Sequence, residues 1–450
     1  MDMTEGPILK KVILYTVPII LTSFLQLLFN AADLIVVGRF SENRELSIAA
    51  VGATGALTNL IVNLFIGLSV GAGVAVAHAV GAHDEKAAHR TVHTAIPLAL
   101  AAGAGLTLVG VLFSGTFLKW MGTPDDVFPL SKTYMQIYFA GIIFNMLYNF
   151  GSAILRAVGD TARPLVYLVI AGVINVGLNL LFVIAFGLDV AGVALATTIS
   201  QGVSALLVLL NLMTRRDTCR LELHKMRFYK QPFLKLLRVG LPAGIQSSVD
   251  AISNVMIQSS VNSFGSTVMS GNAAAVNIDG FVWIAMNAFS HTALNFMGQN
   301  VGAKRYDRVK RVLATCLGCD AVVGIALGVG ARLLAPQLLG IYIVDSDQAI
   351  MYGVIRITCI CMVYFPCGLM DVMTGAIRGM GASLTPMLIT IIGVCGTRIA
   401  FILTLFNLPA FHNLYALYLI YPISWVLTLA AQLIAFNIIY NKQKSLQAAQ

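Results

Sequence analysis

The amino-acid sequence predicts an all-α polytopic membrane protein with twelve transmembrane helices in two six-helix parallel repeats, an N-lobe and a C-lobe, around a central cleft. Composition is the first reason, because only 11% of the 450 residues are charged and 58% are hydrophobic, whereas soluble domains carry about 25% charged residues. The second reason is that residues 12–32 contain no charged residue, and a helix needs about 20 such residues to cross a bilayer. The third is that the two halves of the chain repeat the same landmarks in the same order.

Apolar blocks separated by Gly, Pro or charged residues mark the expected membrane helices. These blocks are expected to be helical because lipid offers no hydrogen-bond partner to an open strand edge or loop. The predicted spans are residues 11–38, 48–78, 91–113, 131–155, 164–185, 190–212, 236–262, 272–299, 312–335, 350–376, 386–406 and 416–440.

Lys and Arg residues are distributed unevenly between alternate loops. With the N-terminus inside, twenty-two of the 29 basic residues fall in cytoplasmic segments and five in outer ones, as the positive-inside rule requires. The pattern predicts that both termini lie in the cytoplasm. It also explains the net charge of +9 without nucleic acid as a partner, since the lipid bilayer is the expected surroundings.

Landmarks of the first half recur in the second half at offsets between 221 and 224 residues. Six helices per half give both halves the same orientation, so the repeats are expected to be parallel. The predicted domains are an N-terminal lobe (1–212), a basic cytoplasmic linker (213–235) and a C-terminal lobe (236–450). The repeated landmarks are Pro18 and Pro242, Val80-Gly81-Ala82 and Val301-Gly302-Ala303, and Arg156, Gly159 and Pro164 with Arg378, Gly381 and Pro386.

Several motifs carry a family resemblance. Residues 30–38 read Asn-Ala-Ala-Asp-Leu-Ile-Val-Val-Gly, residues 155–164 read Leu-Arg-Ala-Val-Gly-Asp-Thr-Ala-Arg-Pro, and residues 299–303 read Gln-Asn-Val-Gly-Ala. In this order and duplication they resemble the multidrug and toxic compound extrusion (MATE) family, in its DinF-like and NorM-like bacterial branch. The resemblance implies a monomeric exporter of the bacterial cytoplasmic membrane. Such a protein exchanges organic cations, drugs or toxins for H⁺ or Na⁺ and needs no other cofactor.

The candidate cation site centres on Asp33. A charge at membrane depth costs roughly 2.5–3.5 kcal/mol on insertion scales, so it needs a reason to be there, and a carboxylate can take up a proton or bind sodium. The resemblance adds Asn175 and Asn179, which are four residues apart and share one helix face. The alternatives are a silent hydrogen-bonded Asp33 and an ordinary interhelical amide pair.

The candidate substrate-binding residues are Asp250, which the resemblance matches to an acidic position of helix seven, Asp279 with Trp283, Gln26 and Gln246. A carboxylate beside an aromatic ring suits a lipophilic organic cation. The alternatives are that Trp283 packs against a neighbouring helix and that the glutamines are lipid-facing or core residues.

Two other classes remain open. One is a flippase for lipid-linked oligosaccharides or other lipid precursors, which should present cations to phosphate; the five acidic residues inside predicted helices outnumber Arg356 and Arg398, which favours a cationic substrate. The other is an enzyme, which is not expected, because the CxxC pair of Cys316 and Cys319 has no second pair or nearby His to complete a metal site, and the histidines are scattered. The sequence also contains no GxxxxGK[ST] motif for a nucleotide.

Overall fold

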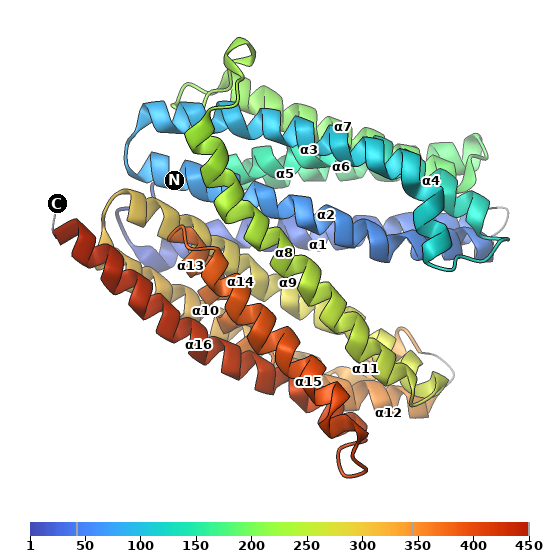
Figure 1. Ribbon diagram of the computed structural model, residues 1–450. Helices are drawn as coiled ribbons and strands as arrows, with labels where there is room; N and C mark the ends of the chain where they lie inside the picture. Colours follow the sequence, from blue (N-terminus) through green and yellow to red (C-terminus); the bar gives the residue numbers. More distant parts are fainter. Residues whose placement is uncertain (42–43, 344–345, 449–450) are drawn as a thin grey trace. The chain divides into compact units, whose positions relative to one another are not determined.

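The computed structural model describes residues 1–41, 44–343 and 346–448, without the side chains of residues 53, 56, 57, 59, 60 and 448. The described residues form helices and short connections, with no strand among them (Figure 1). The N-terminal half contains α1 (Ile8–Phe40), α2 (Arg44–Gly81), α3 (Glu85–Trp120), α4 (Phe128–Ala140), α5 (Ile142–Ala157), α6 (Ala162–Leu180) with a π-helical end (Leu181–Ala185), and α7 (Asp189–Thr214).

The C-terminal half is built in the same manner. It contains α8 (Lys230–Asn262), α9 (Ser266–Gly302), α10 (Tyr306–Leu333), α11 (Ala335–Gly340), α12 (Asp347–Arg356), α13 (Phe365–Gly379), α14 (Leu384–Thr390), α15 (Thr397–Leu403) and α16 (Leu414–Ala448), with π-helical segments at Ile357–Cys361 and Ile391–Gly396. Each predicted span falls on one of these helices or on consecutive ones, which confirms the all-α polytopic class.

The hydrophobic surface fits a lipid environment. Eight helices in the described ranges are long and apolar enough to cross a membrane, or up to ten if each of two bent pairs is one span. Large apolar side chains stand exposed on these helices, including Val173 on α6 and Val322 on α10, each 69% exposed. Such surfaces are unfavourable in water and favourable against acyl chains.

The chain divides into two compact units. The first comprises Met1–Asp2 and Leu21–Gly244, and the second Met3–Ile20 and Ile245–Gln450. The helices α1 and α8 therefore each contribute residues to both units. The changes of unit, after Ile20 and after Gly244, come two residues after Pro18 and Pro242, and proline removes a backbone hydrogen bond inside a helix.

Two predicted spans are bent pairs of helices. The span predicted at 131–155 consists of α4 and α5, which meet at Gly141 with a bend of 43°. A Cβ atom at Gly141 would lie 2.5 Å from the Thr198 side chain, so only glycine fits this corner. The span predicted at 350–376 consists of α12 and α13 with a bend of 45°, and Pro366 occupies the first turn of α13, where a missing N–H is tolerated.

Glycines hold the first part of α8 against α2 inside the first unit. Gly67 and Gly71 on α2 face Gly240 and Gly244 on α8, each pair being four residues apart. A Cβ atom at Gly67 would lie 2.2 Å from the Gly244 nitrogen, and one at Gly71 2.2 Å from the Leu236 carbonyl oxygen. This is the small-residue packing by which membrane helices approach closely.

Backbone conformation repeats between the two halves. His83 and Lys304, which directly follow the two Val-Gly-Ala landmarks, have φ angles of 52° and 57°, and Gly159 and Gly381 both have φ of 86°. Positive φ is uncommon for residues other than glycine. Its recurrence at matched positions shows that the sequence repeat is also a structural repeat.

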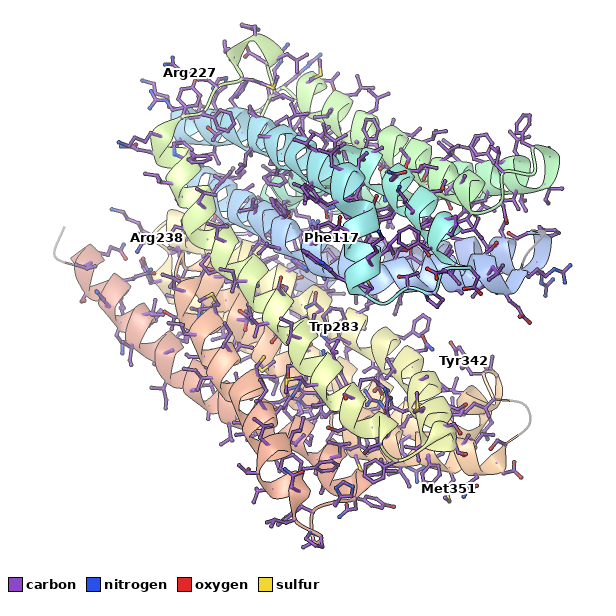
Figure 2. All side chains as sticks on the ribbon, turned by 45° about the vertical axis from the view of Figure 1, so that its right-hand side comes forward. Phe117, Arg227, Arg238, Trp283, Tyr342 and Met351 are labelled. Atoms are coloured by element: carbon purple, nitrogen blue, oxygen red, sulfur yellow. The ribbon has the colours of Figure 1, made fainter. Side chains whose placement is uncertain are left out.

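The connection between α7 and α8 is attached to α3. The Glu222 N–H donates to His93 Nε2 (2.9 Å) and the Arg227 N–H to the His93 carbonyl oxygen (3.1 Å); Arg227 is labelled in Figure 2. Because His93 Nε2 accepts, its Nδ1 carries the proton and donates to the His89 carbonyl oxygen (2.7 Å). These bonds fix the middle of the basic linker.

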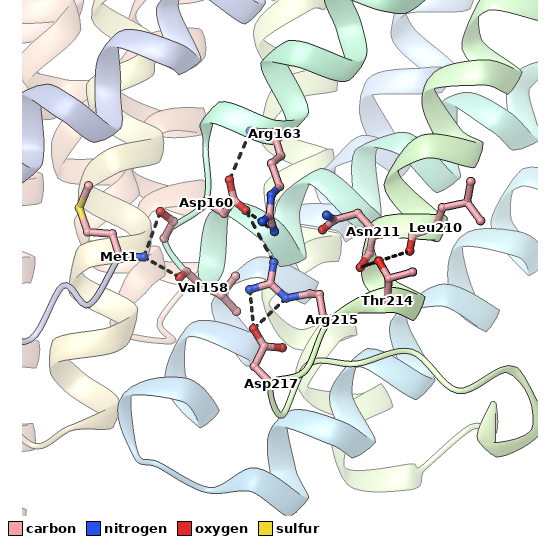
Figure 3. A network of polar contacts seen from close by, with 10 residues as sticks. Met1, Val158, Asp160, Arg163, Leu210, Asn211, Thr214, Arg215 and Asp217 are labelled. Carbon is pink, nitrogen blue, oxygen red and sulfur yellow. Dashed lines mark hydrogen bonds and ion pairs between the residues drawn. The ribbon is translucent and has the colours of Figure 1, made fainter.

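An ion-pair network ties the start of the same linker to the loop before α6 (Figure 3). Asp160 lies 3.3 Å from Arg163 and 3.7 Å from Arg215, and Arg215 also pairs with Asp217. Burial alone would raise the pKa of Asp217, but the hydrogen bond and positive charge of Arg215 outweigh it and lower that pKa. The charged motif at residues 155–164 thus has a structural use.

Candidate functional site

Asp33 lies on α1 where that helix packs closely against α6. The contact depends on Gly172, because a Cβ atom there would lie 1.6 Å from Cζ of Phe29. Asp33 follows Phe29 by four residues, and Asn175 and Asn179 follow Gly172 by three and seven residues, so each set shares one helix face. The fit of the Phe29 ring over Gly172 therefore brings Asp33 to the two asparagines.

The Asp33 carboxylate is the centre of a closed polar network. The Asn179 amide donates to Asp33 Oδ1, and the Thr197 hydroxyl donates to Asp33 Oδ2 (3.1 Å). Asn179 also donates to Asn175 Oδ1 (3.2 Å), and Asn175 donates to Thr197 Oγ1 (3.3 Å). Asp33, Asn175 and Asn179 are buried. The predicted trio is thus brought together, with Thr197 as a fourth member.

One acceptor in this network is unused. The Asn179 carbonyl oxygen is buried and has no hydrogen-bond partner among the described residues. A buried polar atom without a partner costs about 1–3 kcal/mol. An unused amide oxygen beside a carboxylate is a suitable oxygen ligand for a hard cation, or an acceptor for the proton of a carboxylic acid.

Sequence reasoning missed Thr197. It lies on α7, 22 residues after Asn175, and nothing in its spacing distinguishes it from Thr198. The structure separates them, because Thr198 donates to the Ile137 carbonyl oxygen (3.3 Å) instead.

The second unit encloses a polar cavity of about 610 Å³, within the range of about 300–1,000 Å³ usual for small-molecule sites. One stripe of α8 lines it at four-residue intervals: Gln246, Asp250, Asn254 and Gln258. A stripe of α9 also lines it, with Asp279, Trp283 and Asn287; Trp283 is labelled in Figure 2. These polar stripes explain why α8 and α9 are not among the eight helices that are apolar enough to be recognised as membrane-crossing.

The predicted substrate residues divide between the two units. Asp250, Asp279, Trp283 and Gln246 all line the cavity of the second unit. Gln26 does not, since it is exposed on the part of α1 that belongs to the first unit. Gln246 accepts from Arg378 Nη2 at 2.7 Å.

Asp279 lines the cavity with Trp283 but also forms a buried ion pair. Asp279 Oδ2 accepts from Arg356 Nε and lies 2.9 Å from Arg356 Nη2, and both side chains are buried. Arg356 also donates to Asn272 (3.0 Å). Asp279 is therefore neutralised locally, and the carboxyl that interacts with the Trp283 indole belongs to Asp371.

The charge balance predicted for the cleft also changes. Arg378, which the sequence assigns to a cytoplasmic segment, lines the cavity with Arg356 and Arg398, and the acidic lining residues are Asp250, Asp279 and Asp371. The cavity thus carries equal numbers of acidic and basic side chains. Hydropathy did not identify this, because it reports which segments enter a membrane and not which helix faces meet.

Comparison with known proteins supports a common architecture. Residues 18–181 and 242–404 match the profile of the family described as MatE. The chain is similar to the Probable multidrug resistance protein YpnP of Bacillus subtilis (strain 168), with 30% identity over 401 residues and 89% of each chain covered. It is also similar to the Probable multidrug resistance protein YoeA of that organism, with 25% identity over 405 residues, 88% of this chain and 87% of the relative.

A solved structure has a similar fold. It is the Vibrio cholerae MATE transporter VcmN in the bent form, with a TM-score of 0.88, 18% identity, and 97% of this chain and 98% of that chain covered. The two segments that match the family profile begin at Pro18 and Pro242, the first pair of repeated landmarks.

Proposed function

This chain belongs to the MatE family of multidrug and toxic compound extrusion transporters, and from that premise we propose that it is a cation-coupled antiporter. It exports organic cations, drugs or toxins across the bacterial cytoplasmic membrane in exchange for entering H⁺ or Na⁺. Two relatives bear the name of multidrug resistance proteins. The proposed arrangement is a monomer with both termini in the cytoplasm, supported by the excess of Lys and Arg in alternate loops.

The observation that carries the proposal is the Asp33 network. A carboxylate held at membrane depth by the Asn179 and Thr197 side chains, with an unused Asn179 oxygen beside it, suits an ion that binds and leaves. Either H⁺ or Na⁺ neutralises the carboxylate, which lowers the cost of keeping it away from water. Asp33, Asn175, Asn179 and Thr197 are the proposed coupling-ion residues.

Coupling requires the ion to favour one conformation over another. The helix that carries Asp33 extends from one compact unit into the other and contains Pro18 close to the change of unit. A change of hydrogen bonding at Asp33 is therefore proposed to alter the bend of α1. One charge that crosses about 150 mV supplies about 3.5 kcal/mol, which supports a gradient of roughly a few hundredfold for a neutral substrate.

A flippase for lipid-linked precursors is the second candidate. The observation in its favour is that Arg378 and Arg398 line the cavity without an ion pair in the described part of the chain. Such arginines suit a phosphate group. The aromatic lining, with Tyr421 and Trp425, favours a compact aromatic substrate over a lipid-linked precursor. Drug export is therefore preferred to the flippase as the proposed function.

The test is transport in proteoliposomes with ΔpH and ΔNa⁺ imposed separately. Efflux of a fluorescent organic cation should follow one of the two gradients, and Asp33→Asn should abolish the driven part. The matched control is Asp125→Asn, an exposed residue of the loop between α3 and α4, which should transport normally. Full activity of Asp33→Asn contradicts the proposal, and movement of a labelled phospholipid without dye efflux identifies the flippase.

A further inference from the structure

The cavity of the second unit presents its charges in alternating order along α8. Arg378 is bound at Gln246 (2.7 Å), and Arg398 Nη1 donates to Asn254 Oδ1 (3.2 Å). Asp250 lies between these positions, four residues from each. At about 1.5 Å per residue, Gln246, Asp250 and Asn254 follow one another along α8 at intervals of about 6 Å.

Both arginines make their hydrogen bonds to neutral side chains in the described part of the chain. The bonds of Arg398 go to the neutral side chains of Asn254 and Ser424 (each 3.2 Å), and that of Arg378 goes to a glutamine while its Nε is buried without a hydrogen-bond partner. In the described ranges, no ion pair within 4 Å includes Arg378 or Arg398, unlike Arg356 with Asp279. A buried guanidinium without a counter-ion attracts a carboxylate or phosphate from a ligand.

The remaining acids are unpaired in the same sense. Asp250 accepts a weak hydrogen bond from Cys395 Sγ (3.5 Å), and Asp371 interacts with Trp283 and Asn287. Neither forms an ion pair within 4 Å among the described residues, although both interact electrostatically with Arg378 and Asp250 also with Arg398, so each carboxylate can still accept a cationic group. The cavity therefore offers one region for each sign of charge, and a ligand with only one sign leaves the other region unsatisfied.

Aromatic rings form the wall beside Arg398. Its guanidinium lies 4.2 Å from the centroid of the Tyr421 ring, and Trp425 packs between Tyr421 (5.8 Å) and Tyr364 (5.0 Å). Arginine stacked on aromatic rings keeps a planar orientation. Such a wall accepts a flat aromatic ligand and directs its anionic group towards Arg398.

We propose that this cavity binds amphoteric aromatic molecules, with a cationic group at Asp250 and Asp371 and an anionic group at Arg398. This deepens the proposed export function by giving the class of its substrate. It predicts discrimination against purely cationic analogues. Arg398 binds the anionic group of the ligand, and Asp250 binds its cationic group.

The test uses three dyes on one scaffold: a rhodamine with a free carboxylate, its methyl ester and fluorescein. They are amphoteric, cationic and anionic respectively. Binding to the full chain in lipid nanodiscs is measured by fluorescence polarisation, with protein-free nanodiscs to subtract lipid binding. The free acid should bind about tenfold more tightly than either other dye. If the methyl ester binds as tightly as the free acid, the proposal is overturned without the use of any variant.

Variants then assign the two regions. Arg398→Gln should weaken the free acid about tenfold and change the ester less than about threefold, while Asp250→Asn should weaken the ester and spare fluorescein. Arg305→Gln is the control, because Arg305 pairs only at the surface, with Asp307. Equal losses of acid and ester in Arg398→Gln would contradict an anion site.

The binding and transport experiments distinguish failure of the proposed substrate class from failure of the proposed antiporter function. If the free acid binds preferentially but no gradient drives dye efflux, the antiporter function is wrong and the substrate class stands. If an ion gradient drives export of the ester and the free acid binds no more tightly than the ester, the antiporter function stands and the substrate class is wrong.

Discussion

The Asn179 side chain donates its amide hydrogen to Asp33 on α1, while its own carbonyl oxygen is buried without a hydrogen-bond partner in the described ranges. The two residues are separated by 146 positions in the chain. Both Asp33 oxygens accept hydrogen bonds, from Asn179 and Thr197, so the Asn179 oxygen is the acceptor of this network that is left for an incoming ion.

The first prediction concerns Thr197, which holds the other carboxylate oxygen. Thr197→Val removes a hydrogen bond to a charged group, worth about 1.5–3 kcal/mol, while it keeps the shape of the side chain. Because this bond stabilises the ionised carboxylate relative to its ion-bound form, the ion concentration for half-maximal efflux should shift about tenfold or more, at about 1.4 kcal/mol per tenfold. The measurement is the initial efflux rate as a function of ion concentration.

Thr198→Val is the matched control for this change. Thr198 is adjacent on α7, but its hydroxyl donates to the Ile137 carbonyl oxygen and not to Asp33. Its efflux rate should stay within about twofold of the unmodified protein. Equal changes of the ion dependence in the two variants would show that Thr197 acts only on helix packing.

The second prediction concerns the packing that positions Asp33. Gly172→Ala introduces a Cβ atom where the Phe29 ring lies, and overpacking of this kind costs about 1–3 kcal/mol. Stability and coupled transport should both fall. Phe29→Ala combined with Gly172→Ala should recover part of both, because contacting residues are not additive. A double variant no better than Gly172→Ala would argue against the Phe29 contact as the cause.

The third prediction concerns the glycines between α2 and α8. A Cβ atom at Gly67 meets backbone of α8 at 2.2 Å, which no side-chain movement relieves, so Gly67→Ala should destabilise the protein by about 3 kcal/mol. Gly55→Ala on the same helix meets nothing within 4 Å and should be neutral or slightly stabilising. Thermal unfolding in detergent distinguishes them, and equal midpoints would exclude the close contact.

Sequence reasoning identified the parts of the fold that depend on one segment at a time. A crossing helix is recognised from its own hydropathy, and the repeated landmarks were recognised from matching residues at similar offsets; the matched φ angles of His83 and Lys304 agree with them. The corner at Gly141 was not predicted, because its cause is the Thr198 side chain on another helix. Spacing along one helix says nothing about which neighbour it faces.

The same limit explains the site. Asn175 and Asn179 share a face by periodicity alone, and family resemblance was needed to place them with Asp33. The pairing of Asp279 with Arg356 spans 77 positions and depends on how α9 and α12 are turned. Charge counts over whole segments therefore favoured a cationic substrate. The positions of Arg378 and Arg398 in the cavity add basic groups that such counts did not place there.

The final prediction compares two buried aspartates of the second unit. Asp320 on α10 is fully buried, and neither carboxyl oxygen has a hydrogen-bond partner in the part of the chain that the structure describes. A Cβ atom at Gly368 would lie 2.3 Å from Asp320 Oδ2, so no space remains there. Asp320→Asn keeps the shape and removes the possibility of a buried unpaired charge, but its amide N–H groups also lack partners, so stability should rise by no more than about 1 kcal/mol.

Asp279→Asn should have the opposite effect, although the chemical change is the same. It leaves the buried Arg356 guanidinium without its counter-ion, and breaking a buried pair in this way costs about 3–5 kcal/mol. The measurement is the apparent midpoint of thermal unfolding of both variants in one detergent at neutral pH. Because the signs differ, a general effect of removing acidic residues cannot produce the expected pair of results, and a fall in both would show that Asp320 has a stabilising partner.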